Sequence, residues 1–146
     1  MVTRYRRRDP QRGSATVELA ILGPVMIMVF LTIVGIGRVA AAHQAVQAAA
    51  AQAARAASIA RTAETADRDG RVAAEATLKN ESLRCTDSTS KVDTSQFGRA
   101  IGEPANVVAT VTCVVDLGDV TGMTPLPGTI VVTKTSTSPI DTFRGR

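Results

Sequence analysis

The sequence predicts an α+β protein in which a long N-terminal helix leads into a short helix and a small antiparallel β-sheet. Three observations carry this prediction. Residues 19–37 are apolar and uncharged, residues 38–67 are rich in alanine, and the C-terminal third alternates apolar and polar residues. A chain of 146 residues has room for one long helix and one small domain of this kind.

The first 13 residues form a basic leader. They contain five arginines and one aspartate, so they account for the whole formal net charge of +4, and the remaining residues sum to zero. Arginines beside an apolar segment hold that end of a chain in the cytoplasm, which predicts that everything after Gly37 is exported. Beyond the leader there is no basic stripe and there are only three aromatic residues, which argues against a nucleic-acid partner.

Residues 14–37 are predicted to form a membrane-spanning helix. The 19 uncharged residues 19–37 give a helix about as long as the hydrocarbon core of a bilayer is thick. A buried core helix is the alternative, but the rest of the chain has too few large apolar side chains to surround it. Pro24 is compatible with a membrane helix, in which proline is tolerated.

Residues 38–67 are predicted to form an alanine-rich helical stalk that continues the membrane helix. Alanine is the best helix former, and the segment contains neither glycine nor proline. Small side chains recur in a heptad-like stripe, which would let another helix approach closely. The alternative is that the stripe packs on the protein's own domain. The stripe consists of Val39, Ala42, Val46, Ala49, Ala53, Ala56, Ala60 and Ala63.

Residues 68–146 are predicted to form a small exported α+β head. The sequence "DRDG" at 67–70 has the composition of a turn, which predicts that the long helix ends there. Residues 71–83 have the apolar spacing of a short amphipathic helix. Residues 85–97 are rich in Ser, Thr, Asp and Lys, which predicts a loop that contains at most one short strand, at 91–97.

Two strands are predicted near the C-terminus. In residues 106–116 every second residue is apolar and lies on one face of the predicted strand, and most residues of the segment are β-branched. Residues 129–138 form the second strand, and the turn-rich residues 117–128 connect the two as a hairpin with a long loop.

The two cysteines, Cys85 and Cys113, both lie in the part predicted to be exported, where oxidation is permitted. Their pairing would close a loop of 29 residues. On the chain-entropy account such a loop contributes roughly 3 to 4 kcal/mol, which a domain with few aromatic residues needs. Two free thiols are the alternative. A zinc site is disfavoured, because the chain has one histidine and no Cys-x-x-Cys spacing.

The stretch "RGSATVELAILGP" at residues 12–24 places Glu18 at the entrance of the apolar helix. An ionised side chain in a bilayer costs roughly 2.5 to 3.5 kcal/mol on insertion scales, so this carboxylate needs a task. A basic leader that ends in Gly13, a small Ser14, and Glu18 before an apolar helix resemble the class III signal of the type IV pilin superfamily. This resemblance implies that a prepilin peptidase cuts between Gly13 and Ser14. It also implies that Glu18, then the fifth residue, recognises the N-terminal amine of a neighbouring subunit.

The implied role of Glu18 has a physical basis. Cleavage creates an α-ammonium, whose unperturbed pKa is roughly 7.7 to 8.0, at membrane depth. The amine and the carboxylate are each poorly solvated alone, and they offset one another when they pair between two parallel helices. A single such pair would fix the register of helices that could otherwise slide along one another.

Within this superfamily the sequence is most similar to the TadE-like proteins, minor pilins or pseudopilins of the tight-adherence (Flp-type) pilus. The residues that carry the resemblance are "RGSATVELAILGP", the alanine-rich helix, the cysteine-containing strand region and the closing "SPIDTFR" at 138–144. The implied partners are a prepilin peptidase, the major Flp-type pilin and other minor pilins, the inner-membrane assembly platform, and membrane lipid before assembly. Major pilins of this type are little more than the helix, so the additional head favours a minor or accessory role.

Two other targeting hypotheses remain open. A signal anchor would keep the leader and leave a cell-envelope protein outside any pilus, with Glu18 near the cytoplasmic edge of the membrane. A conventional secretory signal could end at "VAAAH", residues 39–43, although 19 uncharged residues exceed the usual length of roughly 7 to 15. Both the pilin and the anchor hypotheses place the protein in the inner membrane with its N-terminus inside, and the pilin hypothesis adds the extracellular pilus.

The sequence offers little for catalysis, and we expect neither a cofactor nor a metal. His43 is the single histidine and lies in the alanine-rich helix, away from any cysteine or carboxylate in the sequence. Asp116 and Asp119 flank a turn, which explains them better than metal binding does. Glycine-rich phosphate loops, His-Glu-x-x-His and nucleophile elbows are all missing, so an exported hydrolase or a lectin-like module is disfavoured.

Overall fold

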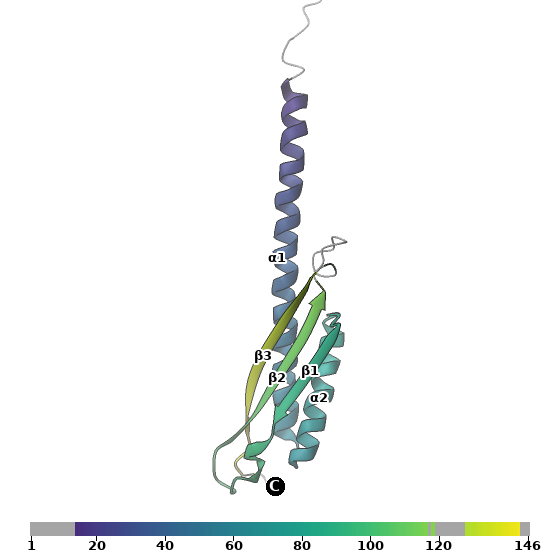
Figure 1. Ribbon diagram of the computed structural model, residues 1–146. Coiled ribbons are helices and arrows are strands. Elements are labelled where there is room, and N and C mark those ends of the chain that lie inside the picture. The colour runs from purple at the N-terminus through teal and green to yellow at the C-terminus, as the bar shows by residue number, and fades with distance from the viewer. Residues whose placement is uncertain (1–13, 117, 119–127, 144–146) are drawn as a thin grey trace, which may run out of the picture.

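The structure, a computed structural model, describes residues 14–116, 118 and 128–143. Its elements are α1 (Ser14–Ile59), α2 (Ala63–Asn80), β1 (Asp87–Asp93), the 3₁₀ helix η2 (Ser95–Gly98), β2 (Ala105–Asp116) and β3 (Thr129–Ile140). We call α2 and the strands the head. The C-terminal half of α1 packs on the head, and the N-terminal half projects from it (Figure 1). The predicted α+β class is therefore confirmed.

The head is built on a three-stranded antiparallel sheet in the order β1-β2-β3. In the central strand every second residue from Ala105 to Val115 is buried, because these side chains point toward the helices. The opposite face carries paired threonines: the hydroxyls of Thr110 and Thr135 lie 3.1 Å apart, and those of Thr112 and Thr133 lie 3.0 Å apart. The period-two alternation predicted for residues 106–116 is thus present and extends to Ala105.

The alanine stripe of α1 packs on the protein's own head. Val46, Ala49 and Ala53 of the stripe belong to a buried core that also contains residues of α2 and of the inner face of β2. The small side chains let the helix backbone approach the sheet closely, as the second of the two sequence interpretations expected. The buried residues of α1 are Ala42, Ala45, Val46, Ala49, Ala50, Ala53, Ala54, Ala57 and Ser58.

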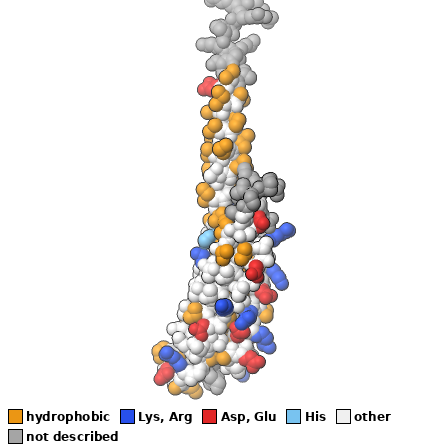
Figure 2. Space-filling view, viewed as in Figure 1, with side chains coloured by type: hydrophobic (Ala, Val, Ile, Leu, Met, Phe, Trp, Pro, Cys, Tyr) orange, Lys and Arg blue, Asp and Glu red, His pale blue; other side chains and the backbone are white. Residues whose placement is uncertain are grey.

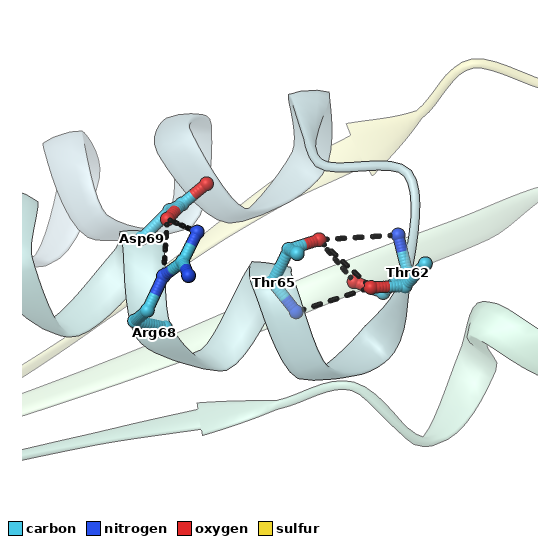
Figure 3. A network of polar contacts seen from close by, with 4 residues as sticks. All are labelled: Thr62, Thr65, Arg68 and Asp69. Carbon is cyan, nitrogen blue, oxygen red and sulfur yellow. Dashed lines mark hydrogen bonds and ion pairs between the residues drawn. The ribbon is translucent and has the colours of Figure 1, made fainter.

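The predicted end of the long helix at residues 67–70 is wrong. α1 ends at Ile59, and α2 begins at Ala63 and runs through residues 67–70 without a break. Thr62 starts α2 with a capping box: its hydroxyl accepts from the Thr65 amide at 3.2 Å, and the Thr65 hydroxyl accepts from the Thr62 amide at 3.2 Å (Figure 3). These reciprocal bonds satisfy two amides at the start of α2, whereas Gly70 has another role.

Gly70 lies where α2 meets α1 and β1. A Cβ atom added there would lie 2.8 Å from Cγ2 of Val92, 3.2 Å from the carbonyl oxygen of Ala53 and 3.4 Å from Cβ of Ala57. Gly70 is buried in the middle of α2, so the glycine serves close packing between elements and not a turn. The charged residues around it stay at the surface, where Arg71 pairs with Asp67 at 3.0 Å. Arg68 pairs with Asp69 at 3.1 Å, as Figure 3 shows.

The third strand lies earlier in the chain than predicted. β1 covers Asp87–Asp93 instead of 91–97, and the chain then turns into η2, where Phe97 is buried. The Ser95 amide donates to the Asp93 carboxylate at 2.9 Å, which ends the strand and holds the pKa of Asp93 below its usual value. Most of the predicted loop at 117–128 lies outside the described residues.

The predicted disulfide between Cys85 and Cys113 is present, and the two Cα atoms lie 5.4 Å apart. Cys113 is fully buried on the inner face of β2, and Cys85 lies in the connection from α2 to β1. The bond therefore joins that connection to the central strand.

Candidate membrane and assembly site

The N-terminal half of α1 is apolar and uncovered. No described side chain from Val17 to Arg38 is buried, and Leu19 and Met28 are 75% and 71% exposed. Hydrophobic side chains cover this part of the visible face, whereas charged side chains gather on the head (Figure 2). A continuous apolar surface of this extent indicates contact with lipid or with other protein.

Among the described residues, α1 is the one helix long and apolar enough to cross a membrane, and none of its most apolar window is buried. A continuous helix pairs its own backbone groups, which a bilayer requires. Pro24 interrupts this pattern because it has no amide hydrogen. Thr32 donates its hydroxyl to the carbonyl of Met28 at 2.8 Å, so this polar group is satisfied within the helix.

Glu18 is exposed near the start of this helix. Ser14 is the first residue of α1, and four residues along a helix correspond to about 6 Å and to the same face. A backbone amine at Ser14 and the Glu18 carboxylate would therefore lie one turn apart on each chain. Gly13 lies outside the described residues, so cleavage after it and the pairing of Glu18 stay predictions.

The remaining polar candidates form no catalytic constellation in the described part of the chain. His43 is exposed and lies in a shallow groove with Gln44, Gln47 and Lys134, none of which is a carboxylate or a thiol. Asp116 accepts a hydrogen bond from the Gly118 amide at 2.7 Å, in agreement with a turn role. Asp119 lies outside the described residues. Within residues 14–116, 118 and 128–143 no group of three His, Cys, Asp or Glu side chains could hold a metal.

Arg38 and Arg84 line one cavity at the base of the projecting helix, although no sequence pattern singles them out. The two arginines come from α1 and from the connection between α2 and β1. No periodicity or motif links them, because their proximity depends on α2 returning along α1.

Taken together, these features define a class of protein in which a small disulfide-linked α+β head leaves the apolar first half of a long N-terminal helix uncovered. Residues 13–55 match the family model described as TadE-like protein, so this segment is similar to that family. The match begins at Gly13, contains Glu18 and covers most of α1. No curated protein and no solved structure matches the chain.

Proposed function

We propose that this protein is a minor pilin or pseudopilin that is processed after Gly13 and is then incorporated into, or initiates, a tight-adherence type IV pilus. One observation carries the proposal. The 46-residue helix α1, most of which matches the TadE-like family model, leaves its first half uncovered and has a single carboxylate, Glu18, at the entrance of that half. A helix of this kind suits a membrane first and a bundle of like helices afterwards.

The proposed course has two stages. Before assembly, residues 19–37 span the inner membrane, the arginine-rich residues 1–13 stay in the cytoplasm, and the head is exported. A prepilin peptidase removes the leader, and the assembly platform then brings α1 beside the helices of the major pilin and of other minor pilins. On assembly the apolar side chains exchange contacts with lipid for contacts with protein, so the apolar area exposed to water changes little. The polar pair at the N-terminus therefore supplies the register.

Glu18 has two possible partners in this proposal. Its own amine at Ser14 is one helical turn away, and the amine of a neighbouring subunit is the other. Pairing within one chain stabilises a helix N-terminus but leaves the register between subunits unspecified. Pairing between chains fixes the register, because a shifted helix would leave a carboxylate and an amine unpaired in an apolar environment.

The substitution Glu18→Ala tests the proposal. We expect cleavage and membrane insertion to stay intact, whereas incorporation into the pilus falls tenfold or more. A tenfold change corresponds to about 1.4 kcal/mol, which is below the roughly 3 to 5 kcal/mol lost when one partner of a buried ion pair is removed. The measurement is the ratio of protein in sheared pili to protein in the membrane.

Glu103→Ala is the matched control, because Glu103 is also an exposed glutamate but lies in the head. Normal incorporation of the Glu18→Ala variant would contradict the assembly role. Equal losses in both variants would show that the assay responds to any change of charge.

A signal-anchored envelope protein outside any pilus is the second candidate. The observation in its favour is that the alanine stripe of α1 is already occupied by the protein's own head, so that stripe offers no surface to other helices. In that case the leader would remain attached and Glu18 would lie at the cytoplasmic edge of the membrane. We assign no catalytic activity to either candidate.

A further inference from the structure

A cavity of about 350 Å³ lies where α1 leaves the head. Its inner wall is apolar and comes from buried residues of two elements, Ala42 and Ala45 of α1 and Val115 of β2. Its exposed lining is polar and charged and includes Arg38, Glu81 and Arg84. The cavity thus combines an apolar wall with two guanidinium groups and one carboxylate.

The fold holds Arg84 at this place from both sides. On one side, α2 ends in a reversal in which Ser82 takes a φ of 56° and the Leu83 amide donates to the Leu78 carbonyl at 3.2 Å. This arrangement is a common way to end a helix with a left-handed residue. On the other side, Cys85 is bonded to Cys113 of β2. The backbone of Arg84 is therefore fixed, and Arg84 forms no ion pair with any residue that the structure describes.

The cavity lies at the level of the lipid headgroups if residues 19–37 span the bilayer, and this step rests on the membrane placement in the proposed function. Arg38 is the first charged residue after that uncharged segment. From Arg38 to Ala42 the helix rises about 6 Å, and the headgroup layer on one side of a bilayer is roughly 5 to 8 Å thick. The arginines therefore face the phosphates of the outer leaflet of that membrane.

We propose that this cavity binds the headgroup of one anionic phospholipid while the protein is in the membrane. Guanidinium groups form paired, charge-assisted hydrogen bonds with phosphate oxygens, and two of them line the cavity. The apolar wall contacts the glycerol and the first methylenes, and the acyl chains continue along the uncovered half of α1. The Glu81 carboxylate also lines the cavity and opposes the phosphate charge, so it weakens the site.

The test compares lipids with matched acyl chains. The full-length protein in nanodiscs or detergent is incubated with phosphatidylglycerol or phosphatidylcholine, and the bound lipid is counted by native mass spectrometry. We expect one phosphatidylglycerol per chain, retained at least fivefold over phosphatidylcholine. The double substitution Arg38→Gln and Arg84→Gln should abolish this preference, whereas Glu81→Gln should raise it.

The matched control is the double substitution Arg55→Gln and Arg61→Gln, which removes the same charge from exposed positions outside the cavity. An unchanged preference in the cavity variant, or an equal loss in the control, would overturn the proposal. A fall in retention for Glu81→Gln would also contradict it, and this variant keeps the test valid if the double variant folds poorly. Displacement of the lipid by millimolar inorganic phosphate would assign the site to free phosphate instead.

This test is independent of pilus assembly. A protein that keeps its leader would still place Arg38 and Arg84 at the membrane surface, so it can bind the lipid even if the pilin proposal fails. Conversely, a processed and assembled protein without lipid preference would refute the lipid site alone.

Discussion

Gly70 shows how one residue can take a different role from the one that its neighbours in sequence suggest. Asp-Arg-Asp-Gly is typical of a turn, but in the structure the missing side chain allows α2 to approach α1 and β1. The local composition could not reveal this, because the contacts at Gly70 come from Ala53, Ala57 and Val92, which are distant in the sequence.

The substitution Gly70→Ala should therefore destabilise the protein by about 1 kcal/mol. Overpacking costs roughly 1 to 3 kcal/mol, and the better helix propensity of alanine returns up to about 1 kcal/mol. The measurement is the unfolding midpoint of the full chain in detergent. In a Val92→Ala background the cost should shrink, because Val92 supplies the closest contact, at 2.8 Å.

Gly98→Ala is the control for this prediction, because a Cβ atom added at Gly98 meets no atom within 4 Å. It should leave the midpoint nearly unchanged. If Gly70→Ala proved stabilising, the close approach of the three elements at Gly70 would be refuted.

At the scale of elements, α1 is one continuous helix with two different environments. Its first half carries large apolar side chains and is uncovered, and its second half carries small side chains and is covered by the head. Composition predicted a long helix and this change of side-chain size, but not the end of the helix at Ile59. It could not decide whether the alanine stripe faces the head or another subunit, because a slim face suits either neighbour. The polar segment 85–97 was also ambiguous, since its strand is set by pairing with β2 and not by its own periodicity.

The disulfide joins the connection between α2 and β1 to the central strand, so removing the disulfide should destabilise the protein. Reduction, or the double substitution Cys85→Ser and Cys113→Ser, should lower the free energy of unfolding by about 3 kcal/mol. The measurement is thermal unfolding of the full chain with and without reductant. The double variant is its own control, because its midpoint should not respond to reductant. A wild-type midpoint that is equally insensitive would refute a stabilising disulfide.

At the scale of the whole molecule, the fold class, the uncovered helix and the pair of cysteines could be predicted from the sequence, because each depends on local composition or on a small number of possible partners. The path of α2 back along α1, and with it the cavity at Arg38 and Arg84, depends on tertiary packing and left no periodic pattern. The candidate site at the N-terminus was predicted from "RGSATVELAILGP" alone, and both cleavage after Gly13 and the pairing of Glu18 stay predictions.

The central claim is that the protein is cut after Gly13, so that a new amine at Ser14 can meet a Glu18 carboxylate. The most direct test is to determine the N-terminal residue of the protein from its own host, by intact mass and terminal sequencing. We predict a mature chain that begins at Ser14. A chain that still begins at Met1, or one that begins near His43, would contradict the claim.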